Sequence, residues 1–230
     1  IVAHQMKSPL GTLQSIVRTL LGGFAGDLTG KQKQMLEGAD RKCSEALDTV
    51  KSLLTLAEAR HRTPGEAGAD LVSAVHEACG RHRSKASERN ISLSCDVKPE
   101  EAWVASSSDA VTEALSALID NALKYTPEGG RVTVRMRLDR EEGRCCLTIA
   151  DSGIGIPEKE RENLFTPFFR ASNARELEPT GTGLGLPFVQ AVVEAAGGNI
   201  WAGTSKMGGA RFSIELPFRS PSTTGKQAER

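Results

Sequence analysis

The chain has 230 residues, enough for two small domains or one large domain. Lysine plus arginine and aspartate plus glutamate balance at 29 each, so no overall charge points to nucleic acid or to an anionic membrane. The sequence contains no run of about 18 apolar residues, which argues against a transmembrane helix.

The cysteines and histidines indicate neither disulfides nor a metal centre. Five cysteines form no C-x-x-C pair, and their odd number favours a reducing compartment. Cys145 and Cys146 are adjacent, so we expect them on opposite faces of a strand. The four histidines lack the spacing of metal ligands. The chain begins abruptly inside an apolar pattern that does not resemble a signal peptide, which indicates a fragment of a longer protein.

Two amphipathic helices are predicted at the start of the chain. Apolar residues recur at steps of three and four from Ala3 to Leu20 and again from Leu36 to Ala57. The glycine-containing stretch 22–26 separates them, which predicts a helical hairpin. A lone hairpin buries little surface, and a second copy would complete it as a dimeric four-helix bundle. The alternative is that the hairpin packs on the rest of its own chain.

An α/β sandwich is predicted after the hairpin, so the fold class is α+β. The hairpin domain is expected over residues 1–60, a Pro- and Gly-containing linker over 61–69, and the second domain over 70–218. From Arg219 the chain is polar, and we expect residues 219–230 to be disordered. Helices are expected over 70–88, 109–125 with Ser108 as N-cap, and 184–196; strands are expected over 91–97, 103–105, 132–138, 145–150, 199–205 and 210–217.

Two glycine-rich runs, Asp151–Ile156 and Gly181–Leu186, organise the second domain. Glycine lets backbone N–H groups approach phosphate without a Cβ in the way. The second run leads into a helical pattern, so its amides would lie at a helix N-terminus, where the dipole favours anions. The runs and the charged segment 157–180 between them predict a nucleotide pocket with a mobile lid.

Three further clusters carry chemistry. His4 lies one position off the apolar seam of the first helix, where it should face solvent. Asn121 and Lys124 are three residues apart on one helix face; an amide oxygen can bind Mg²⁺ and an ammonium group can reach phosphate. The segment 164–170 has aromatic residues to hold a lid in place and ends in Arg170.

In their order along the chain, these clusters resemble the H, N, G1, F and G2 boxes of sensor histidine kinases of two-component systems. The resemblance spans nearly the whole chain. It implies a dimerisation and histidine phosphotransfer domain, followed by a catalytic ATP-binding domain of the gyrase, chaperone and kinase type. It also implies an ATP-dependent protein-histidine kinase that passes its phosphoryl group to an aspartate of a response regulator.

The resemblance implies a role for each matching residue. His4 would be the phosphoacceptor, and Ser8 matches a position implicated in dephosphorylating the partner. Asn121 would bind Mg²⁺, Asp151 would accept a hydrogen bond from the adenine amine, and Arg170 would approach the terminal phosphate. The other implied nucleotide contacts are Lys124, Tyr125, Gly153, Gly155, Ile156, Gly181, Thr182, Gly183, Leu184 and Gly185.

Three positions depart from the family pattern. Gln5 replaces the usual acidic residue after the histidine, Ala117 replaces a polar residue one turn before Asn121, and Ala210-Arg211 stands where Ser or Thr is frequent in the last strand. The first two support an alternative function: a nucleotide-binding, pseudokinase-like regulator or a phosphatase-biased scaffold with weak autokinase activity. A gyrase- or chaperone-type ATPase would need a general base at position 117, and alanine cannot activate water.

The expected cofactors and partners follow from the resemblance. They are ATP, Mg²⁺, a second copy of the chain as a homodimer, and the receiver domain of a response regulator. We expect no nucleic-acid partner and no membrane contact by this fragment. The expected location is cytoplasmic, which allows the complete protein a membrane tether upstream.

Overall fold

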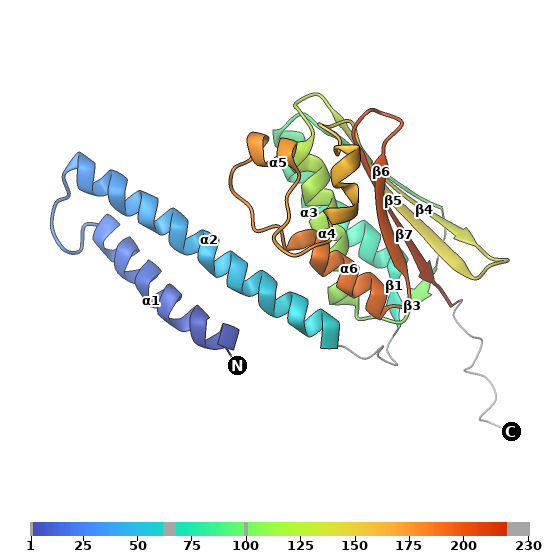
Figure 1. Cartoon of the computed structure of the whole chain (residues 1–230), viewed down its shortest axis with the longest axis horizontal. Coiled ribbons are helices and arrows are strands. Elements are labelled where there is room, and N and C mark those ends of the chain that lie inside the picture. The colour runs from blue at the N-terminus through green and yellow to red at the C-terminus, as the bar shows by residue number, and fades with distance from the viewer. Residues whose placement is uncertain (1, 62–67, 99–100, 220–230) are drawn as a thin grey trace, which may run out of the picture.

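The computed structural model describes the backbone of residues 2–61, 68–98 and 101–219; the side chains of residues 2–8, 45, 48, 51–56 and 58–61 lie outside that description. A helical hairpin lies beside a unit of helices packed on a sheet (Figure 1). This arrangement confirms the predicted α+β class. No described helix is both long and apolar enough to cross a membrane.

The hairpin consists of α1 (Val2–Leu21) and α2 (Gly30–His61), where the apolar seams predicted helices. The turn contains Gly23 and Gly26, whose φ values of +78° and +103° favour glycine. Thr29 and Gln32 then form reciprocal bonds at the start of α2. The Gln32 N–H donates to Thr29 Oγ1 at 3.4 Å, and the Thr29 N–H donates to Gln32 Oε1 at 2.9 Å.

Polar contacts join the two hairpin helices near the turn. Gln14 Nε2 donates to Ser44 Oγ at 2.7 Å, and Arg18 Nε lies 2.9 Å from Asp40 Oδ1. On α1, Leu13 of the predicted seam stays 53% exposed, and Ile16 stays 52% exposed. One copy of the hairpin therefore leaves apolar surface uncovered, and the dimeric bundle stays a prediction.

The second hairpin helix also packs against α6 (Gly185–Ala195) of the other unit (Figure 1). Among the described side chains of α2, Val50 is buried, with 4% of its surface exposed. The alternative that the hairpin packs on its own chain is therefore observed for α2.

The main sheet has the spatial order β2-β4-β5-β7-β6, in which β2 and β4 are parallel and the other neighbours are antiparallel. The strands are β2 (Ser92–Val97), β4 (Arg131–Asp139), β5 (Arg144–Asp151), β6 (Asn199–Thr204) and β7 (Ala210–Pro217). The pairs β4–β5 and β6–β7 match the two predicted hairpins, whereas the pairing of β5 with β7 joins segments that are distant in the sequence and was not predicted. The sheet places Asp151, the last residue of β5, beside the start of β7.

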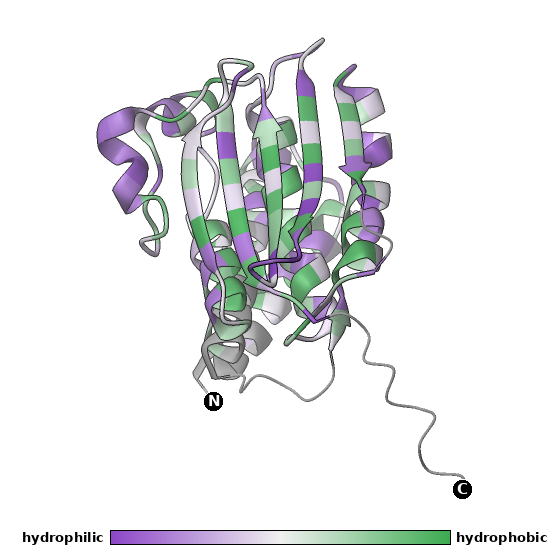
Figure 2. Cartoon of the chain, turned by 90° about the vertical axis from the view of Figure 1, so that its right-hand side faces the viewer, coloured by the Kyte–Doolittle hydropathy of each residue, from purple (hydrophilic) through white to green (hydrophobic). Residues whose placement is uncertain are grey.

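Helices α3 (Leu71–Glu88), α4 (Ser108–Tyr125) and α6 cover one face of this sheet. Figure 2 looks onto the opposite face, with the helices behind, and hydropathy alternates along the strands. On β5, Cys145, Leu147 and Ile149 are each 1% exposed, whereas Cys146 is exposed. The two cysteines thus point to opposite faces as predicted, because successive strand residues alternate.

The start of the second domain differs from the sequence expectation. Ala69, expected in the linker, is fully buried in β1 (Ala69–Asp70), which pairs with β3 (Trp103–Val104). A two-residue strand has no periodicity to reveal it, and its place depends on a partner about 35 residues away. Residues 62–67 of the expected linker lie outside the described residues.

Two further boundaries also differ. The N-cap of α4 is Ser107, whose Oγ accepts from the Ala110 N–H at 3.3 Å, and Ser108 is already helical. Arg219, expected to begin the disordered tail, donates its N–H to the Trp103 carbonyl at 2.8 Å. Its order comes from this long-range backbone pairing, which composition does not reveal. Residues 220–230 lie outside the described residues.

Candidate functional site

A cavity of about 460 Å³ lies between α4, the Asp151 loop and the segment that contains α5 (Ser172–Leu177). Its wall brings together predicted site residues that are distant in the sequence. These are Asn121, Lys124, Tyr125, Asp151, Gly155, Ile156, Arg170, Gly181, Thr182, Gly183 and Gly185. Two predicted residues do not line this cavity. The backbone N–H of Gly153 donates to the Asp151 side chain, and Leu184 is fully buried in the core.

Asp151 is the buried carboxylate of this cavity, with 3% of its surface exposed. Its Oδ1 accepts from the N–H of Gly153 at 2.8 Å and from the N–H of Ala210 at 2.9 Å. Burial raises the pKa of the carboxyl above its usual value, although these two N–H groups act in the opposite direction. Oδ2 accepts no hydrogen bond from a described residue, so it is available to a donor on a ligand.

Two glycines allow the close packing around Asp151. A Cβ on Gly209 would lie 2.1 Å from Asp151 Oδ1, and a Cβ on Gly153 would lie 2.3 Å from the Tyr125 carbonyl oxygen. Any side chain at either position would displace the carboxylate or its supporting loop. Sequence reasoning singled out Gly153 but missed Gly209. The pair Gly208-Gly209 directly before β7 was the available signal.

Asn121 offers an oxygen ligand at the cavity wall. Its side chain forms no hydrogen bond with a described residue, and Ala117 lines the same cavity one helical turn earlier. The described residues contain no group of three or more His, Cys, Asp or Glu side chains that could hold a metal. An amide oxygen fits Mg²⁺, which commonly takes few protein ligands and completes its shell with phosphates and water.

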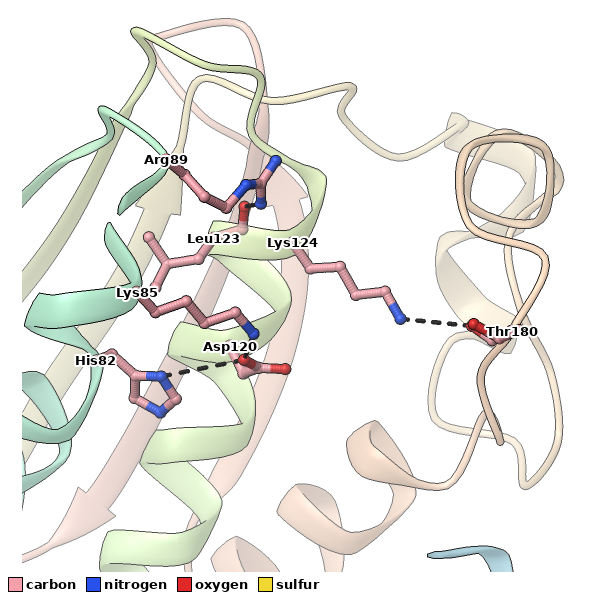
Figure 3. Close-up of polar contacts among 7 residues, drawn as sticks. All are labelled: His82, Lys85, Arg89, Asp120, Leu123, Lys124 and Thr180. Carbon is pink, nitrogen blue, oxygen red and sulfur yellow. Dashed lines mark hydrogen bonds and ion pairs between the residues drawn. The ribbon is translucent and has the colours of Figure 1, made fainter. Parts of the chain in front are cut away.

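Lys124 extends from the end of α4 toward the end of the lid (Figure 3). Its Nζ donates to the Thr180 carbonyl at 3.4 Å and lies 5.8 Å from the centroid of the Tyr125 ring. The preceding acidic residue, Asp120, is instead bound by α3: Lys85 pairs with Asp120 Oδ1, and His82 Nδ1 lies 4.0 Å from the same atom. Burial lowers the pKa of His82 despite this carboxylate.

A second cavity, of about 710 Å³, adjoins the first through Asp120, Lys124, Tyr125 and Ile154. Its basic residues are all engaged by the protein. Arg89 donates to the Leu123 carbonyl at the end of α4, and Lys85 pairs with Asp120 (Figure 3). Arg89 also donates to the Thr126 carbonyl at 3.1 Å. Because the two cavities share part of their lining and the second has no described basic side chain without a protein partner, we treat the second as an extension of the first around the end of α4.

The lid segment carries η1 (Glu158–Asn163) and α5, and Arg170 fixes its second half. The guanidinium donates to the carbonyl oxygens of Ala174 at 3.3 Å and Pro179 at 3.0 Å, and also to that of Glu178. A Cβ on Gly181 would lie 3.2 Å from Arg170 Cζ, so the guanidinium also borders the second glycine run. Arg170 lines the cavity while its donors bind lid backbone.

The lid meets the second glycine run through backbone contact at Phe168. The Phe168 N–H donates to the Gly183 carbonyl at 3.0 Å, and a Cβ on Gly183 would lie 2.7 Å from Phe168 C. Phe165 and Phe169 pack against the core, as expected of residues that hold the lid. Phe168 differs: it has φ of +67° and is 60% exposed, so its ring does not hold the lid on the core.

The family comparison agrees with this geometry. Residues 106–220, half of the chain, match the model of the histidine kinase-, DNA gyrase B- and HSP90-like ATPase family. The chain belongs to this family. Its relatives are sensor histidine kinases, so the chain is the core of a two-component sensor histidine kinase.

Relatives extend the likeness to the hairpin. The sensor histidine kinase WalK of Bacillus subtilis (strain 168) is 29% identical over 220 residues, which cover 95% of this chain and 36% of WalK. SenX3 of Mycolicibacterium smegmatis is 28% identical over 94% of this chain and 56% of its own length. The chain therefore spans between about a third and little more than half of these curated relatives.

Solved structures show the same fold. The mycobacterial sensor histidine kinase MprB matches with a TM-score of 0.60 and 33% identity, over 66% of this chain and 99% of the MprB chain. Full-length ShkA in complex with AMPPNP matches with a TM-score of 0.73 over 95% of this chain and 45% of ShkA. At 23% identity, the ShkA likeness concerns the fold alone.

The kinase core carries three predicted residues in α1: His4, Gln5 and Ser8. Their backbone is helical, and the helix continues through Pro9. Their side chains lie outside the described residues. The roles of His4, Gln5 and Ser8 therefore stay predictions.

Proposed function

We propose that this core is an ATP-dependent protein-histidine kinase that phosphorylates His4 and passes the phosphoryl group to an aspartate of a response regulator. The observation that carries the proposal is the buried carboxylate of Asp151, held by two backbone N–H groups beside a cavity bordered by the Gly181–Gly185 run. A carboxylate selects an amine, and glycine amides ahead of a helix favour phosphate. The cavity thus suits both ends of ATP.

The residues of the cavity divide the work of binding. Asp151 would accept a hydrogen bond from the adenine amine at Oδ2, while Oδ1 stays bound to the protein. Lys124, Arg170 and the amides of Gly181, Gly183 and Gly185 would meet the phosphates. Asn121 would hold Mg²⁺, which would neutralise charge on the phosphates when bound. The match of residues 106–220 to the histidine kinase-, DNA gyrase B- and HSP90-like ATPase family supports ATP as the ligand.

The reaction needs a nucleophile and a route for one proton. A nitrogen of His4 attacks the γ-phosphorus, the bond to the β,γ-bridging oxygen breaks, and ADP leaves. The ring becomes cationic, and its remaining N–H proton must be held or removed. Gln5 can accept that hydrogen bond and fix the tautomer, but an amide cannot take the proton at neutral pH. We therefore propose slow autophosphorylation of His4.

The test is incubation of the unmodified chain with Mg²⁺ and γ-labelled ATP. Label that is acid-labile and base-stable, and that disappears in His4→Ala, would support the kinase. Gln5→Glu should raise the labelling rate at least roughly tenfold, because general-base help is worth about 10²–10⁴-fold. If neither chain takes up label, the activity proposed for His4 is wrong.

Gln5 and Ala117 favour a second candidate function. A pseudokinase-like regulator or phosphatase-biased scaffold would bind nucleotide but transfer phosphate poorly, with Ser8 serving the dephosphorylation of the partner. ATP binding by calorimetry without labelling in either the parent or Gln5→Glu would favour this candidate. The two functions therefore share the nucleotide cavity and differ at α1.

We also propose a homodimer and a receiver-domain partner. The exposed side chains of Leu13 and Ile16 on α1 support pairing with a second copy. Replacing Leu13 with glutamate should then give monomers that still bind ATP, as measured by light scattering and calorimetry. A kinase that uses ATP works where ATP is held, so we place this core in the cytoplasm.

A further inference from the structure

Asn173 joins the lid to the Asp151 loop. It lies on α5, and its Nδ2 donates to the carbonyl oxygens of Ile154 at 3.3 Å and Gly155 at 3.0 Å. Among the described residues, these two bonds are the side-chain hydrogen bonds between α5 and that loop. Asn173 also lines the cavity proposed for ATP.

The other end of the same amide has no partner. Asn173 Oδ1 is buried and accepts no hydrogen bond from a described residue. Its orientation follows from the two carbonyls, because only the amino group of an amide can donate to them. A flipped amide would set Oδ1 against two carbonyl oxygens. Since buried polar atoms in proteins are nearly always paired, Oδ1 is suited to a donor on a ligand.

The chemistry of ATP restricts what that donor is. The ionised phosphates and the adenine ring nitrogens accept hydrogen bonds and do not donate them. In the proposed binding mode, the adenine amine faces Asp151. Both N–H groups of that amine lie on one nitrogen at the Asp151 end, so the donors elsewhere on the nucleotide are the 2′- and 3′-hydroxyls of ribose.

We infer that Asn173 determines specificity for ribose: Oδ1 accepts a hydrogen bond from a ribose hydroxyl while Nδ2 ties the lid to Ile154 and Gly155. This inference rests on the proposed function, because it needs ATP in the cavity. A single side chain thereby couples lid position to recognition of the sugar. By reciprocity, a ligand that lacks the hydroxyl holds the lid less firmly.

The first experiment measures the affinity of the full chain for ATP, 2′-deoxy-ATP and 3′-deoxy-ATP by calorimetry. In the parent, one of the two deoxynucleotides should bind roughly three- to tenfold more weakly than ATP, the size of one hydrogen bond. In Asn173→Ala this discrimination should disappear. The control is Glu176→Ala, an exposed position on the same helix with no hydrogen bond to a described residue, which should discriminate like the parent.

The second experiment follows hydrogen exchange of residues 157–180 in the nucleotide-free chain. Asn173→Asp places a carboxylate against two carbonyl oxygens, so its lid should exchange faster than that of Asn173→Ala, and both faster than the parent. Circular dichroism checks that each variant is folded. Lid exchange equal to that of the parent in both variants would overturn the connection to Ile154 and Gly155.

The outcomes separate this inference from the proposed function. A parent that binds ATP but tolerates loss of either hydroxyl overturns the inference alone. Equal discrimination in the parent and in Asn173→Ala does the same. A parent that binds no ATP overturns the proposed function and the inference together.

Discussion

The two ends of the nucleotide cavity are built differently. At the Asp151 end, a carboxylate that is 3% exposed is held by two backbone N–H groups and packed against Gly209. At the lid end, Lys124 and Arg170 are partly exposed, and their donors bind carbonyls of the lid itself. The first end depends on backbone packing, and the second depends on side chains that can change partners.

This difference has an energetic consequence. The Asp151 end is organised before a ligand arrives, so binding there needs little ordering. The lid end must exchange contacts with its own carbonyls for contacts with phosphates. We therefore expect substitutions at the Asp151 end to act through geometry and affinity, and those at the lid end to act through lid motion.

The largest effect should come from Gly209→Val. Its side chain would start 2.1 Å from Asp151 Oδ1, so either the carboxylate or β7 must move. Overpacking of this kind costs about 1–3 kcal/mol of unfolding free energy, and ATP affinity should fall at least about a hundredfold. Thermal unfolding and calorimetry measure both. Gly80→Ala, in helix α3 with open space around the site, should leave ATP affinity unchanged and raise the unfolding free energy by about 0.5–1 kcal/mol.

Next is Asp151→Asn, which keeps the shape and removes the charge. Because a charge-assisted hydrogen bond contributes about 1.5–3 kcal/mol, ATP affinity should fall roughly ten- to hundredfold while the fold is kept. Calorimetry and circular dichroism test this together. Unchanged affinity would show that position 151 does not contact the adenine amine, and it would contradict the proposal that this end of the cavity binds adenine.

A smaller effect is expected from Arg170→Ala at the lid end. The loss of three contacts to lid carbonyls should speed hydrogen exchange of residues 171–180 about tenfold, without changing the unfolding temperature of the core. Arg175→Ala is the matched control, since Arg175 is an exposed arginine of α5 with no side-chain bond to a described residue. Equal exchange in the two variants would mean that Arg170 does not hold the lid.

The smallest effect is a difference in pH dependence. Burial raises the folded-state pKa of Asp151, so its contribution to stability is present at low pH and is lost as pH rises through that pKa. The unfolding free energy of Asp151→Asn should therefore rise relative to that of the parent as pH rises from below the usual aspartate pKa through the raised pKa of Asp151. Urea unfolding at several pH values measures the gain.

Asp96→Asn should change the pH dependence of the unfolding free energy in the opposite direction. Arg137 lowers the pKa of this exposed carboxyl through a hydrogen bond, so its contribution is present above the unfolded-state pKa and is lost as pH falls. Asp96→Asn should therefore lose stability relative to the parent as pH rises. Parallel curves for the two variants would contradict the contrast between a buried and an exposed carboxylate.

Much of the fold was accessible to sequence reasoning because it follows from local periodicity. The apolar steps of three and four predicted α1 and α2, and alternation predicted the antiparallel hairpins β4–β5 and β6–β7. The glycine runs predicted which turns border the cavity, because these turns need backbone conformations that favour glycine. Gly155 and Gly183 indeed have positive φ, at +68° and +67°.

Other features depend on contacts between distant segments, which no local sequence pattern predicts. Gly209 matters because β7 brings it against Asp151, 58 positions earlier in the chain, and Arg170 was expected at a phosphate but binds lid carbonyls. The contact of α2 with α6 and the unpaired Oδ1 of Asn173 belong to the same class. The sequence by itself determined the long helices, the strands of the main sheet and the order of the five clusters, since these depend on residues close in the chain. Only the tertiary structure decided which atoms meet, because packing and hydrogen bonding between distant segments depend on the whole core.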